Sequence, residues 1–271
     1  MNYIIVIPSY KRPNLIQSHT LNVLESSNIN SIAIYIFVAN KKEYNDYKTA
    51  LKAKYHKNII IGKKGLKNQR NFISNYFPEN VNIVQLDDDI KSINKLTHYN
   101  KENRTSNKLK TLNDLNKFII ESFHKCKELN SYLWGVYPIN NAYFMFPRMT
   151  KDLRFITGPM FGIINRHNKV LKLTVDEKED TQRTLQYFTL DNIVLRFNNI
   201  TIDTDYYRNK GGMQFENKNR KASALKSAHY LIKKYPNLTK LDIKKKSGVP
   251  EVRLLNRKRT SSKKTKKLNK N

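Results

Sequence analysis

Cysteine and acidic side chains are scarce in this 271-residue chain. The single cysteine, Cys126, excludes an intrachain disulfide framework and a cysteine-based zinc site. It also favours an intracellular compartment, the cytoplasm or the nucleus of a eukaryotic host. No apolar run approaches the roughly 20 residues of a membrane span, so we expect no transmembrane segment. The opening MNYIIVIPSYKRP lacks a basic start and a small-residue cleavage site, which favours a buried strand over a signal peptide.

The shortage of acids leaves a formal net charge of +29, with 51 Lys and Arg against 22 Asp and Glu. One interpretation is a compositional bias toward Lys, Asn and Ile, as an AT-rich genome produces. The other is a polyanionic partner, either nucleic acid or an anionic membrane. Residues 242–271 alone hold 12 Lys and Arg and two acids. We therefore expect a folded domain over residues 1–241 and a basic, largely disordered tail over residues 242–271.

Short apolar runs alternate with helical patterns along the chain, which predicts an α/β fold with a mostly parallel central sheet flanked by helices. In such sheets, ligands bind beyond the carboxyl ends of the strands. The expected strands are 4–7, 32–39, 58–62 and 83–86. The expected helices begin at Pro13, cover 67–77, follow a capping box of Thr111 and Asp114, and lie near 179–188 and 221–234.

The fourth expected strand ends abruptly in three acids, Asp87, Asp88 and Asp89. Alternate residues of an extended chain point the same way, so Asp87 and Asp89 can share one target while Asp88 faces elsewhere. Two carboxylates on one side suit Mg²⁺ or Mn²⁺ bound together with substrate phosphates. A solvated acidic turn, or pairing with Lys91 and Lys95, is the alternative.

The segment after the third expected strand favours a nucleotide diphosphate as the partner of that metal. Gly62 and Gly65 allow close backbone approach to a ligand. Lys63, Lys64, Lys67 and Arg70 place cations nearby. Neither GxxxxGK[ST] nor GxGxxG is present, which disfavours a P-loop ATPase and a dinucleotide-binding domain.

Five segments taken together resemble the GT-A nucleotide-sugar glycosyltransferases. They are 4-IIVIPSYKRP-13, 65-GLKNQRN-71, 86-LDDD-89, 157-TGPMFGI-163 and 179-EDTQRTLQYF-188. Within that class the pattern is similar to the group associated with TET/JBP-type DNA oxygenases, which includes the base J glucosyltransferases. The resemblance covers roughly residues 1–215 and implies a GT-A-like domain with a UDP-sugar donor and a Mn²⁺ or Mg²⁺ cofactor.

The resemblance also implies roles for individual residues. Asp87 would contact the ribose or sugar and share the metal with Asp89, and Asp88 stays a candidate contact because three consecutive acids blur the DxD motif. The base of the donor would be framed by Pro8, Ser9, Tyr10 and Arg12, and the nucleotide or sugar would be contacted by Gly65, Asn68 and Arg70.

A second acidic cluster opens the helix expected near residue 179. Glu179 and Asp180 are explained simply as helix-start acids, stabilised by the dipole and the free N–H groups. The functional interpretation is a general base for an inverting sugar transfer, with Asp180 as the candidate and Glu179 beside it. A retaining enzyme would not need this base. Further on, Lys210, Gly211 and Gly212 form either a donor-covering lid or a surface turn.

Four functions remain open from the sequence, one of them a nucleotidyltransferase, which uses a similar sheet and acid pair. The leading one moves a hexose, glucose by resemblance, from a UDP-sugar onto a hydroxymethylated pyrimidine in DNA. The second keeps the GT-A enzyme but changes the acceptor to a protein, lipid or glycan. The third is a basic nucleic-acid-binding protein without catalysis, which explains the charge but not the ordered acids, arginines and glycines.

Overall fold

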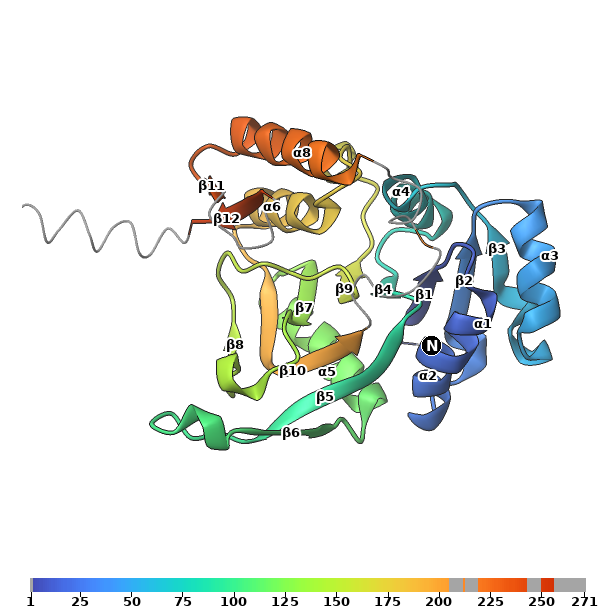
Figure 1. Ribbon diagram of the computed structural model, residues 1–271, viewed down its shortest axis with the longest axis horizontal. Coiled ribbons are helices and arrows are strands. Elements are labelled where there is room, and N and C mark those ends of the chain that lie inside the picture. The colour runs from blue at the N-terminus through green and yellow to red at the C-terminus, as the bar shows by residue number, and fades with distance from the viewer. Residues whose placement is uncertain (1, 205–211, 213–218, 243–249, 256–271) are drawn as a thin grey trace, which may run out of the picture.

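The computed structural model describes residues 2–204, 212, 219–242 and 250–255. Its centre is a ten-stranded sheet in the order β3-β2-β1-β4-β9-β7-β10-β5-β6, with β8 paired to β10 (Figure 1). The first four strands are parallel neighbours, and they match the four strands expected from the sequence. They are β1 (Ile4–Pro8), β2 (Ile34–Val38), β3 (Ile59–Ile61) and β4 (Asn82–Leu86).

The second half of the sheet mixes directions. Strands β5, β8 and β9 run against the rest, which share one direction. The expected α/β class with a large, mostly parallel sheet is therefore confirmed. The antiparallel strands lie on the side of the sheet that begins with β9, next to β4. The additional strands are β5 (Ile90–His98), β6 (Lys108–Thr111), β7 (Leu133–Tyr137), β8 (Met149–Thr150), β9 (Met160–Ile164) and β10 (Leu195–Thr204).

Helices cover both faces of the sheet. Both faces are apolar, as the side chains of β1 show by alternating between two apolar clusters. Ile5 and Ile7 point into the first cluster and Val6 into the second. The first face is covered by α1 (Pro13–Ile16), η1 (Gln17–Leu21), α2 (Asn22–Ser26), α3 (Lys41–Ala50) and α5 (Leu115–Glu128). The second is covered by α4 (Leu66–Tyr76), α6 (Glu179–Asp191) and α8 (Arg220–Lys234).

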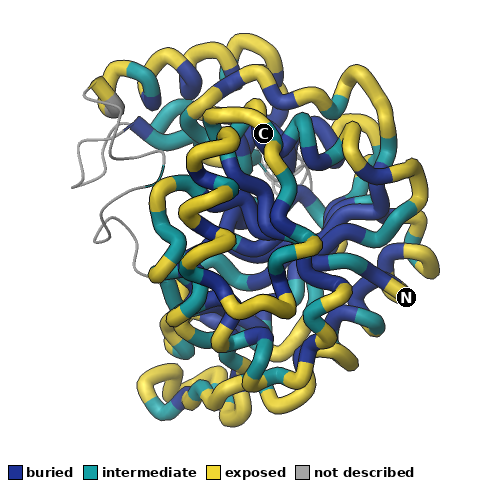
Figure 2. The backbone as a smooth tube through the Cα atoms, turned by 90° about the vertical axis from the view of Figure 1, so that its right-hand side faces the viewer, coloured by how far each residue is buried: buried dark blue, intermediate teal, exposed yellow. Residues whose placement is uncertain are grey.

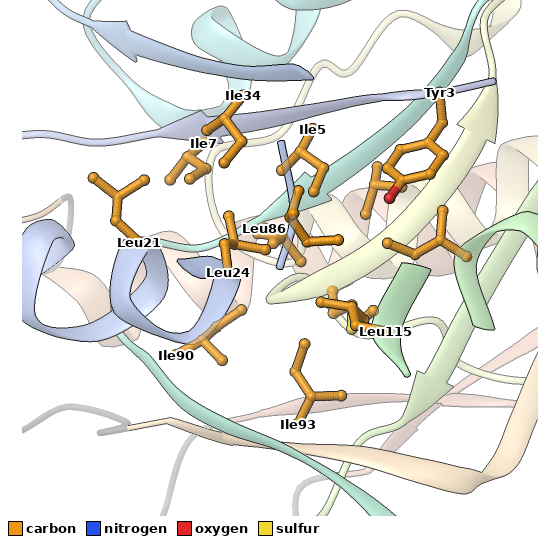
Figure 3. Close-up of a cluster of buried hydrophobic side chains, with 14 of the residues drawn as sticks. Tyr3, Ile5, Ile7, Leu21, Leu24, Ile34, Leu86, Ile90, Ile93 and Leu115 are labelled. Carbon is orange, nitrogen blue, oxygen red and sulfur yellow. The ribbon is translucent and has the colours of Figure 1, made fainter. Parts of the chain in front are cut away.

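The first cluster binds the early helices to the strands that carry the site. Leu21 and Leu24 pack with Ile7, Leu86 and Ile90, so the turn between β4 and β5 is fixed on its inner side (Figure 3). Figure 2 shows the buried strands at the centre, with exposed segments on the outer helices and loops. Short 3₁₀ turns complete the fold: η2 (Ser31–Ala33), η3 (Ala53–Asn58), η4 (Arg104–Ser106), η5 (Ala142–Phe144) and η6 (Lys169–Leu171).

Two expectations about boundaries need correction. Helix α5 begins at Leu115, and its N-cap is Asp114, whose side chain accepts a hydrogen bond from the Lys117 backbone N–H. The expected capping box was wrong because Thr111 still belongs to β6, where it pairs with Asn94. In a capping box the first residue, not the fourth, accepts that bond.

The expected boundary at residue 241 falls inside a strand. Strand β11 (Thr239–Asp242) pairs with β12 (Glu251–Leu254), so part of the expected tail is ordered. Val252 and Leu254 pack against the second apolar cluster, which explains why this part of a basic segment joins the fold. No helix among the described residues has the length and apolarity required to cross a membrane.

Candidate active site

The loop after β1 is held by a network of buried hydroxyl and carboxylate groups. Ser9 Oγ donates to Asp88 Oδ2 at 2.6 Å and lies 2.6 Å from the Tyr47 hydroxyl. That hydroxyl also accepts the Arg12 backbone N–H at 3.0 Å. Glu43 accepts the N–H of Lys11, whose φ of 57° is left-handed. We call the segment Asp87–Asp89, between β4 and β5, the acid turn. The loop that includes Pro8, Ser9, Tyr10 and Arg12 is thus fixed by α3 and by the acid turn.

The three aspartates do not follow strand alternation, because Asp88 and Asp89 lie in the turn after β4. Asp88 is buried, with Oδ2 on Ser9 and Oδ1 2.9 Å from Arg12 Nη1, and Asp89 Oδ2 lies 3.5 Å from the same nitrogen. Asp87 pairs instead with Arg70, and the side chains of Asp87 and Asp89 are 30% and 15% exposed. Asp88 therefore positions the loop after β1, while Asp87 and Asp89 keep partly exposed carboxylates. Thr20 braces the turn, because its hydroxyl donates to the Asp87 carbonyl oxygen and accepts the Ile90 N–H.

These carboxylates hold more negative charge than their surroundings neutralise. Burial, opposed by Arg70 and reinforced by Asp88, raises the pKa of Asp87 to about 6. Burial and repulsion from Asp87 and Asp88 raise the pKa of Asp89 to about 7. A pair of oxygen-donor groups that resists ionisation alone is chemically suited to a divalent cation.

The described residues contain no group of three or more His, Cys, Asp or Glu side chains arranged to hold a metal. Asp87 and Asp89 are thus two ligands at most, and a metal there would need oxygens from a bound donor to complete its coordination. Mg²⁺ binds commonly in this way, through one or two carboxylates and substrate phosphates. The residues present fit such a shared metal.

The loop between β3 and α4 is closed by Gln69. Its side-chain oxygen accepts the Lys63 N–H at 2.6 Å, and its side-chain nitrogen donates to the Val38 carbonyl at 3.2 Å. Glycine at position 62 leaves room for this closure, since a Cβ would stand 2.1 Å from Gln69 Oε1 and displace the Gln69 side chain. Gly65 caps α4 with φ of 93°. Asn68 is exposed, and its amide donates to the Lys64 carbonyl oxygen.

Arg70 joins the two acidic clusters that the sequence places about ninety residues apart. From α4, its Nη2 lies 3.3 Å from Asp87 Oδ1 and its Nε lies 3.3 Å from Glu179 Oε1. Nη2 also donates to the Gly158 carbonyl oxygen at 3.2 Å. The Arg70 side chain is only 3% exposed, so it acts as a buried bridge between β4, β9's leading loop and α6.

Glu179 and Asp180 are in different environments although they are adjacent. Glu179 is paired by two arginines, Arg70 and Arg183, the latter at 2.8 Å, and its side chain is 6% exposed. Both guanidinium groups lie over the ring of Phe161, at 4.9 Å and 3.5 Å from its centroid. Glu179 is therefore neutralised and held in place, which suits it to a structural role in the site.

Asp180 is a stronger base than an ordinary aspartate. It is partly exposed, and Oδ1 accepts the Thr181 N–H at 2.7 Å. Burial and repulsion from Glu179 raise its pKa to about 6. The Gly158 backbone lies beside this carboxylate and Arg70, since a Cβ built there would be 3.7 Å from Asp180 Oδ2 and 3.4 Å from Arg70 Nη2, which is ordinary van der Waals contact. The raised pKa of Asp180 suits a general base that works near neutral pH.

Gly212 joins the site from far along the chain. Its N–H donates to the Tyr10 carbonyl oxygen at 3.0 Å, and its φ is 71°. A Cβ would stand 2.7 Å from Arg12 Nη2, so only glycine fits. The expected lid residues Lys210 and Gly211 lie outside the described residues.

Sequence reasoning missed three contributors to this site. Tyr47 and Thr20 act through hydroxyl groups inside helices, where an isolated Tyr or Thr gives no signal. Gly158 belongs to the segment 157-TGPMFGI-163, but its place beside Arg70 depends on the pairing of β9 with β4. The Gly-Pro pair at 158–159 was the one available hint, because such pairs mark turns.

No protein-family model matches this sequence, and no curated protein does. Solved structures do. S. aureus TarS 1–349 in complex with UDP-GlcNAc is 11% identical, covers 86% of this chain and 67% of its own, and superposes with a TM-score of 0.54. The UDP complex of TarS 1–349 is 13% identical, covers 74% of this chain and 59% of its own, and has a TM-score of 0.46.

The match to the UDP-GlcNAc complex defines the class of fold. The chain has a GT-A-like α/β fold similar to that of TarS in its UDP-GlcNAc complex. It spans between 59% and 67% of the length of the TarS chains it resembles.

Proposed function

We propose that this protein is a metal-dependent glycosyltransferase that moves a hexose from a UDP-sugar onto a hydroxymethylated pyrimidine base in DNA. One observation carries the catalytic part: Arg70 brings Asp87, from the acid turn, next to Glu179 and Asp180, from the start of α6. This arrangement lies in a GT-A-like fold, and TarS, which shares that fold, is bound to UDP-GlcNAc.

The donor side is supported by preorganisation. The loop of Ser9, Tyr10 and Arg12 is fixed by Asp88 and Tyr47. The Gly212 backbone packs against the Arg12 side chain. Within the described part of the chain, the buried Arg70 Nη1 has no hydrogen-bond partner. An oxygen of the donor sugar or diphosphate would satisfy it, since unpaired buried donors are otherwise costly. A divalent cation held by Asp87 and Asp89 would offset negative charge on the diphosphate leaving group.

The chemical step assigned to this chain is a proton transfer. The acceptor hydroxymethyl oxygen forms a bond to the anomeric carbon, the bond from that carbon to the UDP oxygen breaks, and UDP leaves with the electron pair. Asp180 takes the hydroxyl proton, which is why its pKa of about 6 is useful. Attack from the face opposite the leaving group inverts the anomeric centre. A double displacement, with retention, would give Asp180 no such role.

The DNA acceptor rests on charge. The formal net charge of +29 includes a basic body as well as the tail, and Lys and Arg contacts to phosphates make affinity fall steeply with salt. A base in a duplex must be flipped out before its hydroxymethyl group reaches a carboxylate. An intracellular location is part of this proposal, since the acceptor is found there.

Nucleoside mass spectrometry tests the proposal. Oligonucleotides containing hydroxymethyluracil or hydroxymethylcytosine are incubated with Mn²⁺ and either UDP-glucose or UDP-GlcNAc. We expect the mass of one sugar residue to be added to one modified base and none to the unmodified base. Asp180→Asn should lower the rate of product formation by about 100-fold or more, whereas Asp176→Asn should not, because Asp176 is exposed and pairs only with Lys67 in the described structure.

The outcomes separate the competing functions. UDP release without a DNA product would retain the enzyme and move the acceptor to a protein, lipid or glycan. Neither UDP release nor donor binding, across a panel of nucleotide sugars, would leave a non-catalytic nucleic-acid-binding protein. A product that keeps the donor's anomeric configuration would discard the role given to Asp180.

A further inference from the structure

Residues 90–111 form a hairpin of β5 and β6 that runs along the lower edge of the molecule (Figure 1). We call it the basic arm, because it holds six Lys and Arg and one acid, Glu102. Strand β5 begins at Ile90, directly after Asp89, so the arm continues the acid turn without a break. The nine residues of β5 span about 30 Å at about 3.3 Å per residue.

The register of the arm sets two lysines against each other. Lys95 pairs with Lys110, and His98 pairs with Lys108, across the two antiparallel strands. All four residues are exposed. Like charges directly opposite each other destabilise a sheet, so this register is unfavourable for the chain alone. A polyanion along this face would turn the repulsion into attraction.

A rigid aromatic turn lies beside the arm. The 3₁₀ turn η5 exposes Tyr143 and Phe144, at 44% and 47%, with ring centroids 5.0 Å apart. The turn is held firmly: the Asn141 side chain accepts the Tyr143 N–H, and Met145 behind it is 1% exposed.

The arm and the aromatic turn are connected by direct contacts. Asn107 donates to the Ala142 carbonyl at 3.1 Å, and Asn94 donates to the Asn140 side chain at 3.1 Å. Turns η4 and η5 also pack together. Asn94 precedes Lys95 and Asn107 precedes Lys108, so the contacts to the aromatic turn leave the arm on the face opposite these lysines. The arm is only two strands wide beyond β10 and ends at the edge strand β6, so a flexible polymer that wraps this edge can contact both the lysines and the two exposed rings.

The aromatic turn and the acid turn leave the same edge of the sheet. Strand β4 is antiparallel to β9, and β9 is antiparallel to β7, so β4 and β7 point the same way. The aromatic turn follows β7 as Asp87–Asp89 follows β4. A linear polymer can therefore run from the aromatic turn along the arm toward the acids.

We propose that the basic arm and the aromatic turn form a docking surface for single-stranded DNA, with phosphates on Lys95, Lys108 and Lys110 and bases stacked on Tyr143 and Phe144. This inference rests on the proposed DNA acceptor and deepens it. A linear polyanion fits better than a bilayer, because the arm leads along a single strand to the acid turn. Stacking on aromatic side chains tolerates any sequence, so the surface holds the strand while the acid site selects the modified base.

The test measures fluorescence anisotropy of a labelled 20-nucleotide single strand between 50 and 200 mM salt. The arm variant is Lys95→Gln/Lys108→Gln/Lys110→Gln, and the aromatic variant is Tyr143→Ser/Phe144→Ser. The charge-matched control is Lys42→Gln/Lys48→Gln/Lys57→Gln, three exposed lysines near β3 at the opposite end of the sheet. Donor hydrolysis, read as UDP release, is measured for every variant.

We expect the arm variant to reduce the salt slope of log affinity by about 2, from about 0.7 per lost phosphate contact on a single strand. The aromatic variant should weaken binding about tenfold or more with its slope unchanged. The control should bind like the wild type, and UDP release should be equal in all four proteins.

Three results would overturn the docking surface. The first is equal loss in the arm and control variants, which would make the charge effect non-local. The second is full binding by the aromatic variant. The third is binding of phosphatidylserine vesicles, but not of DNA, that depends on the same residues. In each case UDP release by the wild type would still stand, so failure of the surface is distinguishable from failure of the proposed catalysis.

Discussion

The acid site and the basic arm are adjacent in sequence but differ in how their charges are arranged. Opposite charges are paired in the acid site, and like charges face each other in the basic arm. In the acid site, formed by Asp87–Asp89 and by Glu179 and Asp180, the carboxylates are buried or half-buried, and Arg12, Arg70 and Arg183 pair with them. In the arm, exposed cations face each other across two strands. Removing one member of a buried network leaves an uncompensated charge, whereas removing one exposed cation relieves repulsion. Substitutions should therefore have large effects in the first region and small ones in the second.

The largest expected effect is on catalysis by Asp180. Asp180→Asn should lower kcat by about 100- to 10,000-fold while UDP-sugar binding is retained, because the amide cannot accept the acceptor's proton. In the wild type, kcat should rise with pH up to about 6 and then level off, following the raised pKa of Asp180. Initial rates and donor titrations of the variant and of Asp176→Asn measure this. A flat pH profile across pH 5–7 would assign the proton to another group.

The next largest effect concerns the stability of the bridge. Arg70→Met should lower the free energy of unfolding by about 3–5 kcal/mol, because Asp87 and Glu179 lose a cation that is 3% exposed. The matched control is Arg154→Met, since Arg154 is 38% exposed and pairs with Asp152 on the surface. That control should cost about 1 kcal/mol or less. Urea unfolding measures both, and equal losses would remove the distinction between buried and exposed pairs.

A smaller effect has the opposite sign. Asp89→Asn should raise the stability of the metal-free protein at pH 8 by about 1–2 kcal/mol, while abolishing any stabilisation by Mn²⁺. The folded-state pKa of Asp89, about 7, is above the ordinary aspartate value of 3.8, so the wild type loses stability as pH rises from about 4 to about 7. The advantage of the variant should therefore grow across that window and vanish below it. Thermal unfolding at several pH values, with and without Mn²⁺, gives the answer; a variant less stable than wild type at pH 8 would contradict it.

The smallest effect lies on the arm. Lys110→Gln should stabilise the protein by about 0.2–1 kcal/mol, because Lys95 then faces a neutral side chain. Lys42→Gln, on α3, should have no comparable effect. High salt should reduce the difference, since exposed charges are screened. Urea midpoints at 20 and 500 mM NaCl test this, and destabilisation at low salt would mean that Lys110 has a structural role.

The sequence was sufficient for the first half of the fold, where strand and helix periodicities are local. The apolar runs at 4–7 and 83–86 became β1 and β4. The alternation rule failed beyond Leu86, because Asp88 and Asp89 form a turn and both contact Arg12. Residue types also predicted a site at Asp87–Asp89. The UDP-sugar donor, the metal and the DNA acceptor stay predictions.

The relation between distant segments could not be predicted in this way. Arg70 was expected to contact the donor, but its bridge to Glu179 depends on β9 inserting next to β4, a pairing without a local signal. The helix start at Leu115 was misassigned because Thr111 and Asp114 both fit a cap, and only the β5–β6 pairing decides between them. The ordered β12 was missed because its two apolar residues are surrounded by lysines and arginines.

The π-helical turn η1 gives the acid turn an unusual vulnerability. The wide turn at Gln17–Leu21 places the Thr20 hydroxyl between the Asp87 carbonyl and the Ile90 N–H. An α-helix advances about 100° per residue, so deleting one residue before Thr20 would restore regular helix and swing that hydroxyl away from both groups. The acids would keep their sequence and lose their support. Across evolution, we expect this helix to accept substitutions at its surface but to keep its length, because an insertion or deletion here acts on the site as strongly as a change to an aspartate.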